Sequence, residues 1–415
     1  MAIIRPFKAI RPREEYACKI AALPYDVMNS EEARVMAKDN PYSFLHVDKA
    51  EIDLDTNTDI YDRKVYEKAK ENLNKLVKEG AMIQDERAQM FIYRLIMKGR
   101  AQTGIVGCTS IDDYMNDVIK KHENTREDKE KDRINHVDTC DAHTGPIFMT
   151  YRNNEEINEI VDMITVNDPL YEFTAEDGVK HIVWAVDDRE IMETIRGLFE
   201  DIDSLYIADG HHRAASAVKV GLKRRSENPN YTGEEEFNYF LAAAFPDTDL
   251  RIMDYNRVVV DINELTTEEY IAKVAENFEM RIFESEIAYK PINRHTYGMY
   301  IDGKWYELKA KNGTFNPEDP VERLDVSILQ NNLLKPVLGI EDPRTDKRID
   351  FVGGIRGLKE LEKRVEKTHK GVAFSMYPTT IKDLIDIGDA NKVMPPKSTW
   401  FEPKLRSGLF IHPLS

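Results

Sequence analysis

The hydrophobic and polar positions of the first 120 residues predict two helices followed by a β-hairpin. The string SEEARVMAKDNP begins at Ser30, has two glutamates in its first turn and stops before Pro41, as a capped helix does. Residues 59–83 carry apolar side chains at helical spacing and end near a glycine. Residues 88–114 contain two apolar runs on either side of a Lys-Gly-Arg turn, which predicts two antiparallel strands.

Strand and helix signals continue to alternate up to residue 253. Residues 116–151 form a charged helical stretch that ends at a Gly-Pro before an apolar strand. The string KHIVWAV and a short helix at 189–199 follow. Residues 205–207 then predict a short buried strand, and the residues after it predict a helix that Gly221 can stop.

From about Asp254 the pattern changes to short strands with an Asp-Gly hairpin turn at 302–303. Helical signals return later, and a tail rich in proline and lysine predicts an ordered loop. The fold class that we predict is α+β, with a mixed sheet and flanking helices. We expect three parts: an α/β core at 1–253, a smaller β-rich unit at 254–330, and C-terminal helices with the Pro/Lys loop at 331–415 that pack back on the core.

Composition narrows the class of protein. The chain has 415 residues, of which 41% are hydrophobic and 32% charged, and no apolar run approaches the ~20 residues that span a bilayer. Its first residues lack the apolar block of a signal peptide. Three distant cysteines give neither a disulfide framework nor a CxxC metal site, which favours a reducing cytoplasm. A formal charge of −17 repels nucleic acid. We therefore expect a cytoplasmic protein with small-molecule partners, no nucleic acid and no membrane; a homodimer stays open.

The string SLYIADGHHRAASAVKVG places Asp-Gly-His-His-Arg between a strand and a helix. The first N–H groups of a helix have no internal partner and carry partial positive charge, and a glycine lets a ligand approach them closely. An arginine fork and two imidazoles add donors that suit phosphate oxygens. This corner is therefore predicted to bind phosphate or diphosphate. The predicted phosphate-binding residues here are Gly210, His211, His212 and Arg213.

Two other interpretations of the corner stay open. One is a metal site, although adjacent histidines diverge by about 100° on a helix and cannot both grip one metal. The other is an ordinary polar surface on which Asp209 caps the helix.

Strings outside the corner also contain residues that could take part in catalysis or binding. In KHENT, Glu123 could take a proton from a hydroxyl or hold Mg²⁺ through water, with His122 and Thr125 beside it. The alternative is that these residues belong to the solvated charged helix that the following residues predict. In the C-terminal tail, Lys397 and Lys404 suit a phosphate-rich pocket, although the tail could equally pack as a plain terminus.

Near the N-terminus, Asp26 is either a Mg²⁺ ligand or a turn residue, and Arg11 is a candidate clamp for a carboxylate or phosphate. The chain contains no Walker loop, no GxGxxG after a strand, no HExxH and no GxSxG. A phosphate corner without a nucleotide loop leaves room for a donor that is mostly phosphate.

Seven strings, in order and over essentially the whole chain, resemble the DUF1015 family. They are RPFKAIRP, LPYDVMNSEEA, NPYSFLHVDKAE, KHENT, IADGHHRAASA, DYNRVV and MPPKSTWFEPKLRSGLF. The corner is also similar to the phosphate-binding corner of ParB/sulfiredoxin-like proteins, among them free-serine kinases with a Gly-x-His-Arg-like string at a helix start. One departure from the family pattern is Leu23, where proline is expected.

Members of the DUF1015 family have been assigned as pyrophosphate-dependent serine kinases. The resemblance therefore implies phosphoryl transfer from pyrophosphate to the hydroxyl of free L-serine, which gives O-phosphoserine. It also implies a ParB/sulfiredoxin-like core elaborated by extra β-rich and helical segments. The mechanism that we expect adds Mg²⁺ as the cofactor, to bridge the oxygens of the donor. The motif residues carried onto this sequence are Asp209, Gly210, His211, His212, Arg213, His122, Glu123 and Thr125.

The roles that we expect follow from this resemblance and from the residue chemistry. Glu123, His122 and Asp209 would be catalytic, and Asp209 or Asp26 would hold Mg²⁺. Arg11 and Thr125 would bind the acceptor. The alternatives are an ATP- or ADP-dependent serine kinase, a ParB-like nucleotide-binding regulator, and a metal-dependent hydrolase built on the histidines and Glu123.

Overall fold

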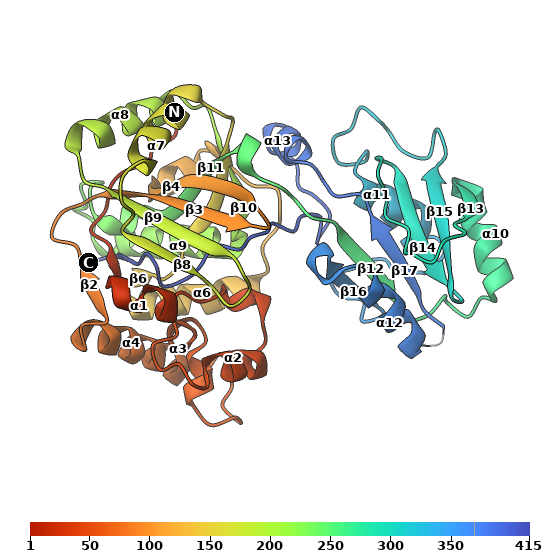
Figure 1. Ribbon diagram of the computed structural model, residues 1–415, viewed down its shortest axis with the longest axis horizontal. Coiled ribbons are helices and arrows are strands. Elements are labelled where there is room, and N and C mark those ends of the chain that lie inside the picture. The colour runs from red at the N-terminus through yellow and green to blue at the C-terminus, as the bar shows by residue number, and fades with distance from the viewer. Residues whose placement is uncertain (369) are drawn as a thin grey trace. The chain divides into compact units, whose positions relative to one another are not determined.

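The computed structural model describes residues 1–368 and 370–415, and the chain divides into two compact units (Figure 1). Unit 1 comprises Met1–Leu250 and Pro403–Ser415, and unit 2 comprises Arg251–Glu402. Each unit has its own sheet and helices, which confirms the predicted α+β class. The residues at 331–402, predicted to pack on the core, belong instead to unit 2, because two of their strands lie inside its sheet.

Unit 1 is built on an eight-stranded mixed sheet. Its central strand pairs are both parallel and antiparallel, and the β3–β4 hairpin turns at Lys98 and Gly99 as predicted, with positive φ angles of 51° and 77°. In spatial order the strands are β5 (Ile119–Lys120), β10 (Leu205–Asp209), β7 (Ile147–Tyr151), β11 (Tyr239–Pro246), β4 (Arg100–Ser110), β3 (Met90–Met97), β9 (Lys180–Val186) and β8 (Tyr171–Thr174). Two small sheets pair β1 (Ile10–Pro12) with β2 (Met82–Gln84), and β6 (Ala142–His143) with β18 (His412–Pro413).

Nine helices of unit 1 surround this sheet in the described residues. They are α1 (Glu14–Ile20), α2 (Ser30–Ala37), α3 (Leu45–Asp48), α4 (Arg63–Lys78), α5 (Ile111–Met115), α6 (Glu127–Cys140), α7 (Glu155–Thr165), α8 (Arg189–Glu200) and α9 (His211–Glu227). Figure 1 shows α7 and α8 together on one side of the sheet, where their apolar faces join its core. Helix α6 packs between α9 and α4. The predicted helix at Ser30 is present, and Asn29 caps it in a capping box with Glu32.

The helix after the corner is longer than predicted. Gly221 was expected to stop it, but α9 continues to Glu227. A Cβ at Gly221 would lie 2.5 Å from the Phe237 carbonyl oxygen and 2.8 Å from the Ile111 side chain. Gly221 therefore allows Phe237 and Ile111 to pack closely against α9, and it does not end the helix.

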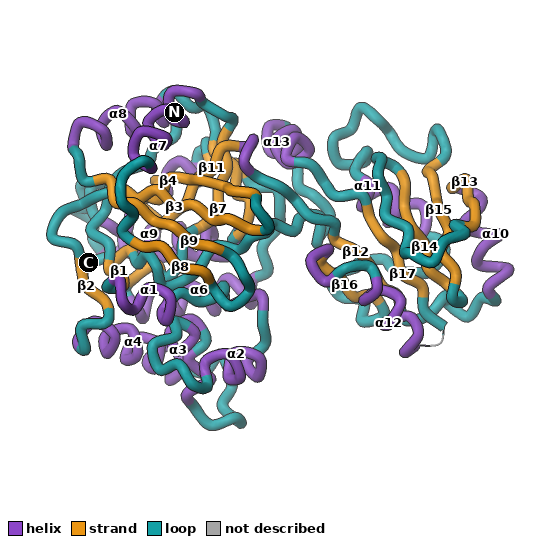
Figure 2. Tube along the Cα trace, in the orientation of Figure 1, coloured by secondary structure: helices purple, strands orange, loops and turns teal. Residues whose placement is uncertain are grey.

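Unit 2 is a six-stranded antiparallel sheet with four α-helices in the described residues (Figure 2). The strands are β13 (Phe278–Ile282), β15 (Lys304–Ala310), β14 (Thr296–Ile301), β17 (Val372–Met376), β12 (Tyr255–Val259) and β16 (Ile349–Gly353). The helices are α10 (Thr267–Asn277), α11 (Asp325–Leu329), α12 (Lys359–Thr368) and α13 (Ile381–Asp389). The predicted Asp-Gly turn joins β14 to β15, and the proline-rich tail contains no helix among its described residues. In the part of the chain that the structure describes, none of the helices is both long and apolar enough to cross a membrane.

Candidate functional site

The predicted corner is a tight strand–glycine–helix junction. Strand β10 ends at Asp209, and Gly210 adopts φ 97° and ψ 31°, a left-handed conformation that turns the chain into α9. The Gly210 N–H donates to Asp209 Oδ1 at 3.0 Å. A Cβ at Gly210 would lie 3.0 Å from Nη2 of Arg213, so a side chain at this position would push the guanidinium away in addition to straining the backbone.

Two cationic side chains flank the Asp209 carboxylate. Lys404 donates to Asp209 Oδ2 at 2.9 Å, and Arg213 donates from Nη1 to the Pro146 carbonyl oxygen at 2.7 Å. Burial alone would raise the pKa of Asp209, but the charges of Lys404 and Arg213 hold it well below its usual value. Nε of Arg213 is buried and has no partner among the described residues. The corner thus combines a helix N-terminus, a lysine and an arginine around one ionised carboxylate.

The two histidines of the corner bind the neighbouring loop. Nε2 of His211 accepts the His122 N–H at 3.4 Å, and Nε2 of His212 accepts the Arg126 N–H at 3.0 Å. Each neutral imidazole therefore carries its proton on Nδ1. Nδ1 of His211 lies 3.8 Å from Glu123 Oε2, and Glu123 is 39% exposed. Burial lowers the pKa of both histidines. The Nε2 atoms of both histidines thus hold the backbone of the loop at residues 122–126, and donation to a phosphate, as predicted for these histidines, would have to come from Nδ1.

The other residues of that loop have structural partners. His122 is 2% exposed, and its ring meets the His211 ring edge-on at 4.4 Å. Burial lowers the pKa of His122 to about 4. The Ile207 carbonyl favours its protonated form, but neither ring nitrogen reaches a hydrogen-bond partner among the described residues. Thr125 donates to the Glu130 carboxylate, which also pairs with Lys219.

Three further predicted residues have neighbours of their own. Arg11 donates to Asp85 Oδ1 at 2.8 Å and to the Tyr171 hydroxyl at 3.0 Å, so partners already hold its guanidinium. Asp26 is exposed in a 3₁₀ turn at Tyr25–Val27, where its charge favours protonated His212. Lys397 belongs to unit 2, and its carbonyl oxygen accepts from Arg257 at 3.0 Å. The roles proposed for these three stay predictions.

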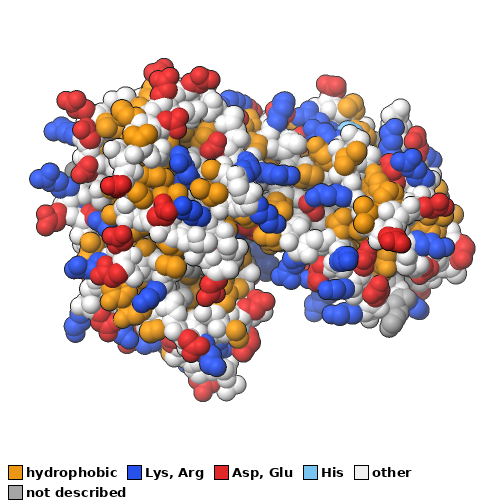
Figure 3. Space-filling view, viewed as in Figure 1, with side chains coloured by type: hydrophobic (Ala, Val, Ile, Leu, Met, Phe, Trp, Pro, Cys, Tyr) orange, Lys and Arg blue, Asp and Glu red, His pale blue; other side chains and the backbone are white. Residues whose placement is uncertain are grey.

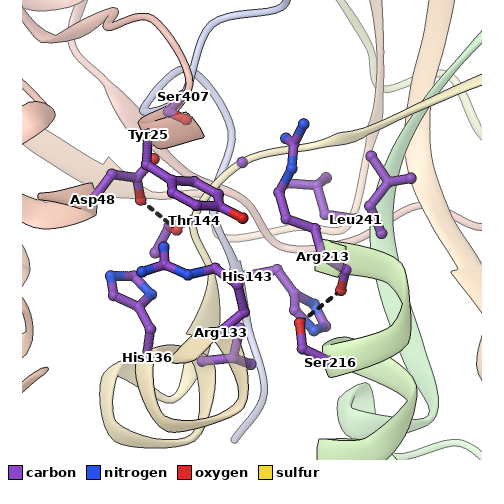
Figure 4. A pocket seen from close by; sticks show the side chains of 13 residues that line it. Tyr25, Asp48, Arg133, His136, His143, Thr144, Arg213, Ser216, Leu241 and Ser407 are labelled. Atoms are coloured by element: carbon purple, nitrogen blue, oxygen red, sulfur yellow. Dashed lines mark hydrogen bonds between the residues drawn. The ribbon is translucent and has the colours of Figure 1, made fainter. Parts of the chain in front are cut away.

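A pocket lies beside the corner, with Arg213 as a member of both (Figure 4). Its empty volume, including the open mouth, is about 420 Å³. The lining residues are Tyr25, Asp48, Arg133, His136, Val137, His143, Thr144, Gly145, Ile147, Arg213, Ser216, Leu241 and Ser407. Sequence analysis missed most of them, because they come from distant segments. One signal was present: Arg133 and His136 stand on the buried face of a helix that is charged elsewhere.

The described residues form no preassembled metal site, because they contain no group of three or more His, Cys, Asp or Glu side chains that could bind one metal ion. The expected Mg²⁺ is compatible with the donor set in another way, since this ion usually binds through one or two carboxylates together with substrate phosphates. Asp209 is such a carboxylate, although Lys404 already occupies one of its oxygens.

Solved structures that resemble the chain do so distantly. A conserved hypothetical protein from Pyrococcus furiosus is 14% identical with a TM-score of 0.36, and the match covers 74% of this chain and 94% of that one. A free serine kinase in complex with AMP is 12% identical with a TM-score of 0.36, covering 75% and 91%. SbnI with a C-terminal truncation, from Staphylococcus aureus, is 10% identical with a TM-score of 0.36, covering 73% and 85%. At these scores we base no argument on the likeness.

The sequence comparisons are more direct. No curated protein matches the chain. The model of a family described as "Protein of unknown function (DUF1015)" matches residues 4–327, the greater part of the chain. The chain therefore belongs to the DUF1015 family, as its seven strings predicted.

Proposed function

We propose that this protein is a phosphotransferase that moves a phosphoryl group from pyrophosphate to the hydroxyl of free L-serine. The hydroxyl oxygen forms a bond to the transferred phosphorus, the bridging P–O bond breaks, and O-phosphoserine and phosphate leave. The hydroxyl proton ends on the departing phosphate or on solvent. One observation carries the proposal: the Arg213 side chain lies both at the helix start that we predict to bind an anion and in the lining of the neighbouring pocket.

The donor would lie at the corner. Phosphoryl transfer depends mainly on positioning and on neutralising charge, and the corner offers main-chain N–H groups and two cations for that purpose. Nε and Nη2 of Arg213 lie near Gly210, and Nη1 donates a hydrogen bond to the Pro146 carbonyl oxygen. These contacts hold the guanidinium in one orientation before the donor binds. Lys404 approaches the same carboxylate from the C-terminal segment.

Glu123 is our proposed base for the acceptor hydroxyl. The proton on Nδ1 of His211 faces its carboxylate at 3.8 Å and orients it. His122 and Thr125 act through position, because one is buried beneath the loop and the other is bonded to Glu130. Mg²⁺, held by Asp209 or Asp26, would neutralise charge on the oxygens of the donor.

The decisive assay supplies L-serine and Mg²⁺ with pyrophosphate, ATP or ADP as the donor. Phosphorus NMR would then detect O-phosphoserine. We expect product with pyrophosphate. Formation with ATP or ADP alone would overturn the donor assignment, and no product with any donor would end the proposal.

A pair of arginine variants connects this activity to the corner. Arg213→Met should lower the rate at limiting pyrophosphate about 100-fold, since a lost phosphate clamp is worth roughly 3 kcal/mol. The control is Arg63→Met, which removes an exposed guanidinium on α4 that pairs with Glu67. Equal loss in both variants would assign the effect to net charge and not to the corner.

A nucleic-acid-binding regulator is a separate hypothesis with a separate test. On the face that Figure 3 shows, acidic and basic side chains are interspersed. Regulation on DNA would need local positive charge to offset the net charge of −17. A filter-binding assay at low salt measures this directly, and we expect no retention.

A further inference from the structure

The pocket lining contains three buried polar groups that have unused hydrogen-bonding capacity. They are the guanidinium of Arg133, the carboxylate of Asp48 and the imidazole of His143, which are 8%, 5% and 7% exposed. Figure 4 shows them around one space with the Arg213 side chain. Buried polar atoms are normally paired, and Nε2 of His143 is a buried atom with no partner among the described residues, so a ligand in the pocket would have to donate to it.

Arg133 offers one open edge of its guanidinium. Nε and Nη2 lie 3.0 and 2.8 Å from Asp132 Oδ2, and the Tyr25 ring covers the guanidinium with its centroid 3.9 Å from Cζ. Among the described residues, none accepts a hydrogen bond from Nη1. The guanidinium is thus held by one edge and one face, and its remaining edge suits an acceptor such as a carboxylate.

Asp48 offers one open carboxylate oxygen. The Thr144 hydroxyl donates to its Oδ1 at 2.7 Å, and Oδ2 has no donor within the described part of the chain. The charge of Asp48 raises the pKa of the nearby Arg133, so the two lie within electrostatic reach of each other. A buried carboxylate beside an arginine edge suits a cationic group such as an ammonium.

His143 offers a lone pair, and a chain of hydrogen bonds explains why. Glu236 Oε2 lies 2.7 Å from Nε2 of His412, so that nitrogen carries the proton. Nδ1 of His412 is then an acceptor, and Nδ1 of His143, 3.2 Å away, must donate to it. Nε2 of His143 is left unprotonated, and it is buried with no partner among the described residues.

The charged and titratable groups around His143 favour this neutral form. Burial lowers its pKa well below the usual value, and His412 and Arg224 add to that effect. Arg5 binds the other oxygen of Glu236 at 2.7 Å and keeps that carboxylate ionised at the end of the chain. An imidazole with a free lone pair accepts a hydrogen bond from a hydroxyl.

Two arginines in one pocket could instead suggest a second phosphate. A phosphate carries one to two negative charges at neutral pH and no cationic group, so the buried carboxylate of Asp48 would repel it. A small zwitterion that bears a hydroxyl complements all three groups. The lining therefore favours an amino acid over an anion.

We propose that this pocket is the acceptor site for a hydroxy amino acid. Arg133 binds its α-carboxylate, Asp48 binds its α-ammonium, and Nε2 of His143 accepts a hydrogen bond from its hydroxyl. In this assignment His143 receives the hydroxyl proton in place of Glu123, which does not line the pocket. The inference rests on the proposed function for the identity of the acceptor. It assigns acceptor binding to these residues in place of Arg11, whose Nε and Nη1 already have partners, and of Thr125, whose hydroxyl donates to Glu130.

Calorimetric titrations of the full chain test the ligand first, which avoids any folding defect. L-Serine, N-acetyl-L-serine, L-serine methyl ester and L-alanine are titrated in the presence of imidodiphosphate as an inert donor analogue. Loss of either charge should weaken binding about 30-fold or more, and loss of the hydroxyl about 10-fold or more. No measurable L-serine binding, or equal binding of all four compounds, would overturn the proposal.

Two variants then locate the site. Asp48→Asn should bind L-serine about 30-fold more weakly, whereas Asp39→Asn, a change at an exposed turn, should leave binding unchanged. His143→Asn keeps a donor at the position of Nδ1 and removes Nε2, so it should bind L-serine and L-alanine equally. Retention of wild-type binding and discrimination by both site variants would overturn the assignment.

Failure of this inference and failure of the proposed function are distinguishable. If L-serine binds with this pattern but no donor gives O-phosphoserine, the function fails and the pocket assignment stands. If O-phosphoserine forms and Asp48→Asn leaves the KM for L-serine unchanged, the pocket assignment fails and the function stands.

Discussion

Replacing Gly210 with alanine should disturb Arg213 without removing any charge. A φ of 97° strains alanine by about 1–3 kcal/mol. The new Cβ would also lie 3.0, 3.1 and 3.2 Å from three guanidinium atoms. The guanidinium cannot move aside freely, because Nη1 donates to Pro146 at 2.7 Å. Losing a hydrogen bond from a charged donor adds roughly 1.5–3 kcal/mol.

Gly178→Ala is the matched control. Gly178 has φ 79°, and a Cβ added there would have no neighbouring atom within 4 Å, so alanine at this position suffers the backbone strain alone. Both glycines lie in unit 1. The difference between the two variants therefore isolates the displacement of the guanidinium.

Hydrogen exchange of the β10 and α9 amides measures the effect in unit 1 alone, whether or not the two units unfold together. We expect Gly210→Ala to lower the opening free energy there by about 1.5–3 kcal/mol more than the strain term seen for Gly178→Ala. O-phosphoserine formation at limiting pyrophosphate should fall about 10-fold or more in Gly210→Ala only. Equal stabilities and equal rates in the two variants would refute the close packing of Arg213 on Gly210 as a determinant of donor binding.

Three further predictions concern titration. Lys404→Met removes a charge that holds the pKa of Asp209 down, so the acid limb of the pH–rate profile for O-phosphoserine should move to higher pH. Burial lowers the pKa of His122 to about 4, so between roughly pH 4 and 6.5 the unfolded chain binds the extra proton and stability falls as the pH drops. His122→Phe should flatten that slope by up to about 1.4 kcal/mol per pH unit in urea unfolding. Burial raises the pKa of Asp325 to about 7, so the folded chain holds the extra proton and stability falls as the pH rises toward 7. Asp325→Asn should therefore raise the thermal midpoint of unit 2 more at pH 8 than at pH 5, as calorimetry would measure.

The corner could be predicted from the sequence because it is local. A strand, a glycine and a helix start lie within a few residues, and the turn needs a positive φ that only glycine adopts easily. The hairpin turns at 98–100 and 302–303 were predictable for the same reason. In each case the residues that determine the conformation are neighbours in the chain.

The pocket could not be predicted in this way. Asp48 is distant in sequence from Arg133 and His143, and the latter two, although ten residues apart, lie on different elements, α6 and β6, so no periodicity relates the three. The sequence also could not show which hydrogen-bonding atoms of these side chains already have partners in the fold. Both corner histidines look like donors to a ligand until the structure shows backbone N–H groups on their Nε2 atoms.

The C-terminal segment connects these two parts of the site. Residues 403–415 return to unit 1 and supply Lys404 to the corner, Ser407 to the pocket and His412 to the imidazole chain. Without Lys404 the Asp209 carboxylate would lose the ion pair that it makes with that lysine, and without His412 nothing in the described chain would orient the proton of His143. The family match ends at residue 327, yet donor and acceptor binding as proposed here both depend on a segment beyond it. Residues 403–415 position side chains at both the corner and the pocket. A substitution that displaces this segment should therefore weaken the binding of pyrophosphate and of serine together.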